Sequence, residues 1–389
     1  MEIDLLSRDL YQSEPESAYR WLHENAPMYW SEAAGVWGVA SHELVLEAER
    51  LPELLSNEAR GSRPFTPKNS SMIDRDDPRH RLQRRFVQPV FAPKVIRARE
   101  RHIREISREL VRAALERETF DLVDDLAAPL PTMMIAEMLG MNPEARAQLQ
   151  HWMDTLVGAA DGEQYVNDEV ISTHMEFVVA TLDLMQQRRG CPGNDMISIL
   201  VNEQIDGEYL DDDSLCSEAL LLLVGGGETT RNVIAGGLHA LLRHPVQLEY
   251  LLSNIDDSDV MTRAIEECLR WVSPVLNMNR TATRDFEFAG EEVSEGDQVL
   301  LMYAAANRDP AVFDAPYAFD ISRSPNPHLA FGSGVHFCLG ANLARLEVRV
   351  MFEEILPHLG ALQLATDGDP QYSWSTFIRG ITSLPVTVR

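Results

Sequence analysis

The sequence has no apolar run long enough to cross a bilayer and no recognisable secretion signal. Its longest apolar stretches, such as Ala219–Val224, are far shorter than the roughly 20 residues that a transmembrane helix needs. The N-terminal residues MEIDLLSRDLYQSEPES show no basic start, no long apolar segment and no small-residue cleavage site. We therefore expect a cytoplasmic protein without a membrane anchor.

Cysteine is also scarce. The four cysteines, Cys191, Cys216, Cys268 and Cys338, are widely scattered, which excludes a disulfide framework and a paired zinc site. This usage suits a reducing compartment.

Basic residues are few: 34 Lys and Arg face 61 Asp and Glu, and the net charge is −27. Such a chain is a poor candidate for binding nucleic acid or an anionic membrane. Residues 77–108 are an exception, because they hold ten Lys or Arg and only three Asp or Glu. This basic segment is either a docking face for a more acidic partner or a solvated amphipathic helix.

What is present is the composition of a globular protein, with 389 residues, 45% apolar and 24% charged. Periodic apolar positions predict helices, whereas strand-like pieces are short and do not alternate regularly with them. We predict a single domain over 1–389, mainly α with a small β portion in 28–40, 275–302 and 361–389. The predicted helices are His42–Arg50, Asp77–Val90, Pro93–Glu118, Glu163–Arg189, Ser214–Leu242, Asp256–Trp271 and Cys338–Leu356.

The segment around Cys338 is the first candidate site. Gly332, Gly334 and Gly340 surround the cysteine, and an apolar helix is expected directly after it. Glycines let a backbone approach a flat ligand closely, and a helix N-terminus stabilises a thiolate. Such a thiolate could ligate haem iron. Taken without its neighbours, Cys338 could equally be a buried structural cysteine.

The second candidate site is the run Gly225-Gly226-Gly227-Glu228-Thr229 inside a long apolar helix. Each interior glycine costs a helix about 1 kcal/mol relative to alanine, so three together need a reason. A phosphate loop fits poorly, because the run is not G-x-G-x-x-G and lacks a Walker lysine. Close helix packing, with Thr229 bonded back to its own helix, is another explanation.

The pattern Phe331-x-x-Gly334-x-x-x-Cys338-x-Gly340 resembles the haem-ligand loop of the cytochrome P450 family. The resemblance extends over nearly the whole chain. It implies a triangular, mostly helical prism that holds haem b, with Cys338 as the iron ligand and Phe331, Gly332 and Gly340 beside the cofactor. The implied reaction is activation of O2 and insertion of one oxygen atom into a substrate C–H bond.

The same resemblance assigns roles in the central helix and the core. The glycines would make room for O2, and Glu228 with Thr229 would be the acid–alcohol pair that delivers protons. Glu267, Arg270 and Arg323 match the family's Glu-x-x-Arg and its third member, which implies a buried charge network. Haem propionates need basic groups, and the family pattern supplies four candidates: His80, Arg84, Arg280 and His336.

The resemblance also implies partners. With no fused flavin domain, the chain looks like a bacterial form that receives electrons from an iron–sulfur ferredoxin and its NAD(P)H-dependent reductase. The basic segment 77–108 would then be the ferredoxin docking face, and we expect a monomer. A thiolate-haem sensor is the alternative class, but Glu228 and Thr229 argue against it, because a sensor needs no proton relay.

Several framework segments resemble the actinobacterial enzymes that oxidise the side chain of cholesterol and cholest-4-en-3-one. They are Met72–Pro78, Asp125–Pro131, Ile205–Leu210, Arg270–Arg280 and Ser324–Phe331. A steroid or isoprenoid side chain is therefore the expected substrate, and a polyketide, terpene or fatty acyl chain is the alternative. The expected pocket is apolar and consists of Pro64, Phe65, Met72, Val224, Gly225, Val275, Leu276 and Phe377.

Overall fold

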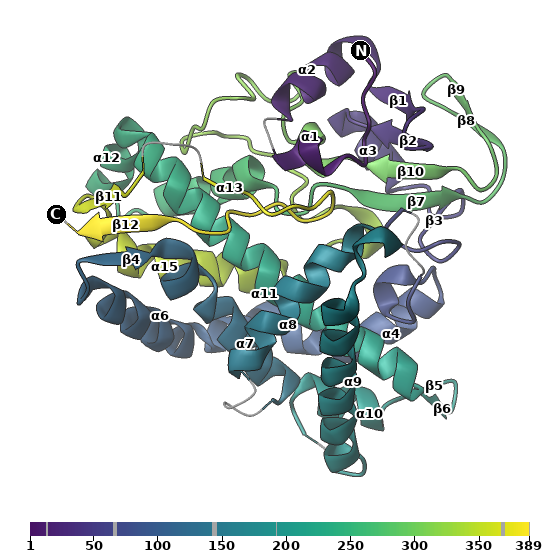
Figure 1. The fold of residues 1–389 in the computed structure, drawn as a ribbon, viewed down its shortest axis with the longest axis horizontal. Helices are drawn as coiled ribbons and strands as arrows, with labels where there is room; N and C mark the ends of the chain where they lie inside the picture. The colour runs from purple at the N-terminus through teal and green to yellow at the C-terminus, as the bar shows by residue number, and fades with distance from the viewer. Residues whose placement is uncertain (13–14, 65–67, 142–145, 192, 367–369, 389) are drawn as a thin grey trace.

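The computed structural model describes residues 1–12, 15–64, 68–141, 146–191, 193–366 and 370–388. Figure 1 shows most helices in the lower and left parts of the molecule and most strands at the upper right. The long helix α11 (Asp212–Arg243) crosses the body of the molecule and packs against α7 (Pro129–Leu139), α13 (Ser258–Val272) and α15 (Ala341–Leu359). The predicted fold class, mainly α with a small β portion, is confirmed.

Side-chain caps set where several helices begin. The side chains of Ser41, Asn167, Asp195, Asp211 and Asp257 accept backbone N–H groups in the first turn of the helix that follows each of them. The remaining helices are α1 (Arg8–Gln12), α2 (Glu16–Asn25), α3 (His42–Ala48), α4 (Arg79–Val87), α5 (Pro93–Ala98), α6 (Glu100–Leu115), α8 (Arg146–Gly158), α9 (Asp168–Arg188), α10 (Met196–Asn202), α12 (Pro245–Ser253) and α14 (Tyr303–Ala306).

Three helix predictions were wrong in detail. The predicted helix Pro93–Glu118 is two helices, because the Arg99 N–H bonds to the Ile96 carbonyl in a tight turn between α5 and α6. The predicted helix Glu163–Arg189 begins only at Asp168, after its cap. The helix after the cysteine begins at Ala341 instead of Cys338, so the cysteine lies in the preceding loop.

The larger sheet has five strands in the order β1 (Met28–Ser31), β2 (Val36–Val39), β10 (Gln298–Leu301), β7 (Met278–Ala282) and β3 (Leu55–Ser56). Strand β10 lies parallel to β2 and antiparallel to β7, and the other neighbours are antiparallel. The sheet therefore joins the N-terminal residues to a hairpin far along the chain. Its position also places residues 275–277, which precede β7, beside the C-terminal loop, where Val275 pairs with Ile378.

The smaller sheets correct one strand prediction. The residues GEEVSEGD (290–297), which the sequence places between the strand-like pieces Phe286–Ala289 and Gln298–Met302, contain β9 (Glu291–Val293), which pairs with β8 (Phe286–Phe288). Ala289 and Gly290 both have positive φ, as a two-residue hairpin turn requires. The other strands are β4 (Thr119–Asp121), β11 (Leu362–Leu364) and β12 (Pro385–Val388) in one sheet and β5 (Gln204–Ile205) and β6 (Glu208–Tyr209) in another.

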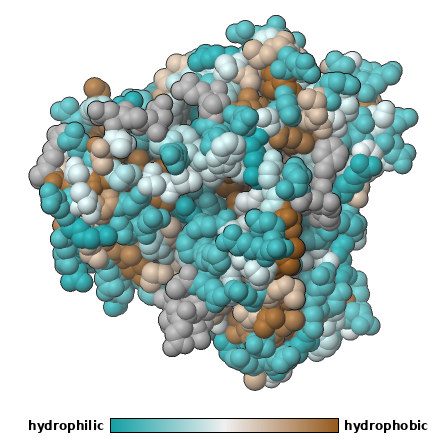
Figure 2. All heavy atoms as spheres, viewed as in Figure 1, coloured by the Kyte–Doolittle hydropathy of each residue, from teal (hydrophilic) through white to brown (hydrophobic). Residues whose placement is uncertain are grey.

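The main apolar core lies among the helices, and two smaller clusters lie beside the five-stranded sheet. No helix within the described residues is both long and apolar enough to pass through a membrane. The face in Figure 2 is mainly hydrophilic, and its apolar side chains form separate small patches.

Candidate active site

The loop that carries Cys338 is held in place by its own backbone. The Cys338 N–H bonds to the Phe331 carbonyl at 2.9 Å, and Gly332 and Gly334 both have φ near +65°. A Cβ at Gly334 would lie 2.7 Å from the Glu49 carbonyl oxygen, so only glycine fits there. Gly332 and Gly334 thus permit a positive φ, and Gly334 lets the loop backbone approach that of Glu49; the predicted approach to a flat ligand stays a prediction.

The Cys338 thiol lies at the start of α15 and is partly buried. Burial raises its pKa, whereas backbone N–H bonds from Gly340 and Ala341 and the charges of Arg84 and Arg345 lower it. The thiol therefore has donors that favour a thiolate but too few to offset desolvation. A bound cation at the sulfur would supply the missing stabilisation.

The four predicted anion-binding residues lie close together beside this loop. The rings of His80 and His336 stack with centroids 4.1 Å apart, and Arg84 donates to the carbonyls of Val335 and Phe337 at 3.3 and 2.6 Å. Burial and the charges of Arg280, His80 and Arg84 lower the pKa of His336 to about 2. Such a concentration of basic groups is suited to binding an anion.

Sequence reasoning missed one acidic residue in this cluster. Glu49, which follows α3, is buried and pairs with Arg280 at 2.9 Å. The Tyr303 hydroxyl donates a very short hydrogen bond to the same carboxylate. Arg280 is thus held by a protein carboxylate, and its own position is fixed before any ligand binds. No local pattern pointed to Glu49, because 231 residues separate it from Arg280.

The three glycines of α11 have different surroundings. A Cβ at Gly226 would lie 2.8 Å from Ile135 of α7, and a Cβ at Gly227 would collide with Met153 of α8. A Cβ at Gly225 would meet nothing within 4 Å, and this glycine is exposed although α11 runs through the core. Two glycines therefore permit close helix packing, and one borders open space. The packing explanation applies to Gly226 and Gly227, and the room for O2 implied by the resemblance stays a prediction for Gly225.

Glu228 and Thr229 come directly after the three glycines in α11. The Thr229 hydroxyl donates to the Gly225 carbonyl at 2.9 Å, as the packing explanation expects. Glu228 is buried and accepts from Arg231 at 3.1 Å and from Asn232 at 3.3 Å. Burial raises the pKa of Glu228, and the nearby Arg231 opposes that shift.

Glu267 lies at the centre of a second charged group. Its carboxylate pairs with Arg270 at 2.7 Å and with Arg323 at 3.1 Å, and the Arg270 and Glu267 side chains have no exposed surface. Arg270 also donates to the carbonyls of Asn307, Pro316 and Ala318. The three residues that the sequence grouped are in contact.

The predicted pocket residues are only partly together. Val275 pairs with Ile378, next to Phe377, and Met72 is buried beside α11. Phe65 lies outside the described residues. Pro64 and Phe377 border one small cavity, and Val224 is partly buried beside Gly225.

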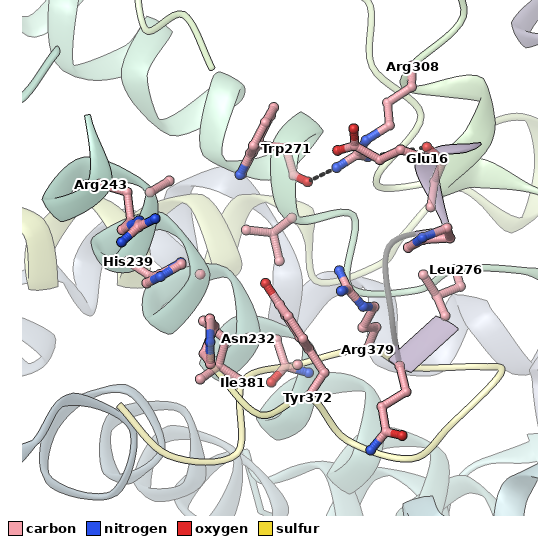
Figure 3. A pocket seen from close by; sticks show the side chains of 18 of the residues that line it. Glu16, Asn232, His239, Arg243, Trp271, Leu276, Arg308, Tyr372, Arg379 and Ile381 are labelled. Carbon is pink, nitrogen blue, oxygen red and sulfur yellow. Dashed lines mark hydrogen bonds between the residues drawn. The ribbon is translucent and has the colours of Figure 1, made fainter. Parts of the chain in front are cut away.

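Leu276 lines a different cavity of about 560 Å³ over the C-terminal half of α11. Figure 3 shows its walls, with Asn232, His239 and Arg243 from α11, Trp271 from α13, and Tyr372 and Arg379 from the C-terminal loop. This cavity is rich in basic side chains, unlike the apolar pocket predicted. Leu276 itself packs with Leu5 and Tyr11 of the N-terminal segment.

Two buried carboxyls were not predicted as site residues. Glu218 of α11 and Glu347 of α15 are almost completely buried, and burial raises the pKa of both. The available signal in the sequence was a glutamate among apolar residues, at Glu218 before Ala219–Val224 and at Glu347 between Leu346 and Val348.

The residues present fit a haem. Cys338 offers a sulfur ligand, and the His80, Arg84, Arg280 and His336 cluster beside it suits two propionates. Gly340 has nothing within 4 Å of a would-be Cβ, so the backbone next to the cysteine leaves room for a flat ring. The described residues contain no group of three or more His, Cys, Asp or Glu that could hold a metal ion.

Comparisons with known proteins agree with this geometry. Residues 134–377 match the family model described as Cytochrome P450. The chain is 41% identical to a steroid C26-monooxygenase of Mycobacterium tuberculosis, over 99% of this chain and 96% of that protein. It is 36% identical to a methyl-branched lipid omega-hydroxylase of the same species, over 99% and 94%.

Solved structures of cytochromes P450 are also similar to this chain. A Mycobacterium marinum cytochrome P450 in complex with pseudoionone has a TM-score of 0.90 and 32% identity, with 100% of this chain and 98% of that chain covered. A Bacillus megaterium cytochrome P450 in complex with testosterone has a TM-score of 0.88 and 30% identity, with 98% and 100% covered.

Proposed function

This chain belongs to the cytochrome P450 family and is a monooxygenase, and we propose that it hydroxylates the side chain of a steroid or isoprenoid lipid. Its cofactor is haem and its co-substrate is O2. The observation that carries the proposal is 41% identity to a steroid C26-monooxygenase along nearly the whole chain. The relative named methyl-branched lipid omega-hydroxylase makes a branched acyl chain the second candidate.

Cys338 is the proposed iron ligand. When bound, haem supplies the iron at which O2 is activated. Burial raises the pKa of the thiol, and the N–H groups of Gly340 and Ala341 with the charge of Arg84 oppose that shift, so they would help to stabilise the thiolate once the iron is bound. Phe331, Gly332 and Gly340 are proposed to lie against the ring.

His80, Arg84, Arg280 and His336 are proposed to bind the propionates. Burial and then the charges of Arg280, His80 and Arg84 lower the pKa of His336, and an anion bound beside it would offset the repulsion. The Glu49 carboxylate forms an ion pair with the Arg280 guanidinium at 2.9 Å. This pair fixes the direction of the remaining N–H donors of Arg280.

Glu228 and Thr229 are the proposed proton-delivery pair. A raised pKa brings the Glu228 carboxyl closer to the pH at which the enzyme works, and this favours both taking up and giving up a proton. The Thr229 hydroxyl donates to the Gly225 carbonyl and keeps its oxygen lone pairs free to accept from water or substrate. Gly225, with no side chain, leaves the space beside that hydroxyl open.

The proposed redox partner is a small acidic ferredoxin. Helix α4 supports this because its two faces differ. His80 and Arg84 reach toward the cysteine loop, whereas Arg79, Arg81 and Arg85 are exposed. A donor that docks on the exposed arginines would approach Cys338 across one helix. We further propose a monomer that works in the cytoplasm, in keeping with four free cysteines.

The test is a visible-absorption titration of the purified holoenzyme with cholest-4-en-3-one, a methyl-branched fatty acid and a macrolide. Displacement of water from the iron by a bound substrate shifts the spectrum from low to high spin. We expect a saturable shift with the sterol and a weaker one with the branched acid. A shift with the macrolide alone would overturn the lipid assignment, and product analysis by mass spectrometry would then locate the hydroxyl group.

A further inference from the structure

Glu218 of α11 joins three parts of the chain. Its side chain has no exposed surface, and it lies seven residues before Gly225. Oε1 accepts the Met72 N–H at 2.7 Å and Nε2 of Gln83 at 3.2 Å. One carboxyl thus connects α11, the short 3-10 turn Met72–Asp74 and helix α4.

The 68–74 segment that Glu218 holds has bonds on two sides. The Ser70 hydroxyl donates to Asp213 at 2.7 Å, which is a second bond to α11. On the other side, the Asp74 carboxylate accepts the Ser62 N–H at 2.8 Å, and Nδ2 of Asn57 donates to the Ile73 carbonyl at 2.9 Å. Release of the bonds to α11 would therefore leave the segment attached along this other side.

The surroundings of Glu218 disfavour its charged form. No described residue forms an ion pair with it, and burial raises its pKa to about 8. Arg75, which follows the 3-10 turn, is the one cation that lowers it, and Arg75 itself pairs with Glu58. Helix α10 packs against both α4 and α11 and carries no charged residue.

Two oxygens in this group have no hydrogen-bond partner, Oε2 of Glu218 and Oε1 of Gln83, and both are buried. An ionised Glu218 would leave a charge among them with no cation in contact. A neutral Glu218 keeps both observed hydrogen bonds through Oε1 and avoids that cost.

We propose that Glu218 is a positioning residue that, while protonated, latches the 68–74 segment onto α11, and that its ionisation releases the segment from α11 and uncovers the buried Met72 to ligand. The ligand part of the proposal rests on the proposed function, because Met72 is one of the expected substrate contacts. The latch itself depends only on the contacts of Glu218.

The direction of the pH effect follows from proton linkage. In the open form Glu218 meets water and titrates near the ordinary glutamate value, whereas in the closed form it titrates near pH 8. The closed form therefore binds the proton more tightly. Between these two pKa values, the ratio of closed to open form falls close to tenfold for each pH unit by which the pH rises. Above pH 8 this ratio is constant.

The first experiment is hydrogen exchange of the holoenzyme, measured by mass spectrometry at peptides that contain the Met72 amide. We expect the protection factor of this amide to fall close to tenfold per unit between pH 6 and 7.5 in the unmodified protein. In Glu218→Gln, which keeps an acceptor but cannot ionise, protection should not depend on pH. An equal pH dependence in Glu218→Gln, or none in the unmodified protein, would overturn the latch.

Two further variants separate the latch from general unfolding. Glu218→Ala removes the acceptor, so Met72 should be poorly protected at every pH while the Leu300 amide in β10 keeps its protection. Loss at both amides would mean global destabilisation and would count against a local latch. Glu203→Gln, which changes an exposed glutamate directly before β5, should behave like the unmodified protein.

Stopped-flow binding of cholest-4-en-3-one tests the ligand part. At pH 6 the sterol should bind at least several-fold faster to Glu218→Ala than to the unmodified protein. Equal binding rates alongside a changed Met72 exchange would reject the gating of ligand entry. If the sterol binds neither protein while the exchange results hold, the proposed substrate fails and the latch stands.

Discussion

Glu267 and Glu228 are both buried glutamates with an arginine three residues later, and their environments differ sharply. The Glu267 carboxylate accepts five hydrogen bonds, from Arg270 (twice), Arg323, Asn326 and the Asp320 backbone. Glu228 accepts two, from Arg231 and Asn232, and both are longer than 3.0 Å. A carboxylate with every lone pair occupied is held in one state, whereas one with few donors can exchange a proton.

The arginines differ in the same way. Arg270 has no exposed surface and gives its other donors to three backbone carbonyls, so it belongs wholly to the core. Arg231 is shared between Glu228 and Asp154, whose side chain is half exposed. The Glu267 group is therefore suited to stabilising the fold around the cysteine loop, and the Glu228 group is suited to chemistry. An identical local spacing thus supports two unlike roles.

The largest expected effect is at Glu267. Glu267→Ala leaves Arg270 and Arg323 without their carboxylate, and Arg270 would be a buried, uncompensated charge. We expect a loss of about 3–5 kcal/mol in the free energy of unfolding, measured by urea denaturation, and poor haem retention. Glu228→Ala is the matched control, with a smaller loss. Equal losses in the two variants would remove the distinction drawn between them.

The next effect is catalytic. Glu228→Gln keeps the size of the side chain and an acceptor for Asn232 but cannot carry a proton. We expect turnover to fall about 100-fold or more while folding and sterol binding are retained. The measurement is product formation in a reconstituted system at saturating ferredoxin. Undiminished turnover would mean that Glu228 is as structural as Glu267.

A smaller change is expected at the neighbouring hydroxyl. Thr229→Ala should leave NAD(P)H consumption within a few-fold of normal but divert much of it to hydrogen peroxide, because the ordered hydroxyl next to the open space at Gly225 is lost. Peroxide and product would be quantified together. Thr230→Ala, a buried threonine one position along the same helix, is the control and should stay coupled. Unchanged coupling in Thr229→Ala would exclude this hydroxyl from proton delivery.

The smallest effect is a pH dependence of stability. Burial raises the pKa of Glu228 in the folded state above its unfolded value, so the folded state binds the proton more tightly. The contribution of Glu228 to the free energy of unfolding is fully present below the pKa that it has in the unfolded chain. This contribution declines as pH rises toward the pKa in the folded state, by at most about 1.4 kcal/mol per pH unit. The difference in unfolding free energy between Glu228→Gln and the unmodified protein should therefore grow with pH. A constant difference from pH 5 to 8 would show that Glu228 does not titrate differently on folding.

Much of the architecture was accessible from local patterns. The apolar periodicity and caps located α11 and α13 to within two residues, and the glycine spacing around Cys338 predicted a tight loop before a helix. Family resemblance then grouped Glu267, Arg270 and Arg323, which are in contact. The errors arose where a short polar segment forms a hairpin, as β9 does with β8, or where the tertiary structure turns an apolar residue into a different cavity, as for Leu276.

The sequence by itself determined the helices, the cysteine loop and the identity of the polar residues inside α11, because these depend on neighbours within a few positions along the chain. The tertiary structure alone decided what each buried carboxyl does. Glu49, Glu218, Glu228 and Glu267 are all buried by the fold. Glu49, Glu218 and Glu267 also accept hydrogen bonds from residues tens to hundreds of positions away, whereas Glu228 accepts them from its own helix. Desolvation and hydrogen bonding set the charge of a carboxyl, and both depend on the neighbours that folding supplies.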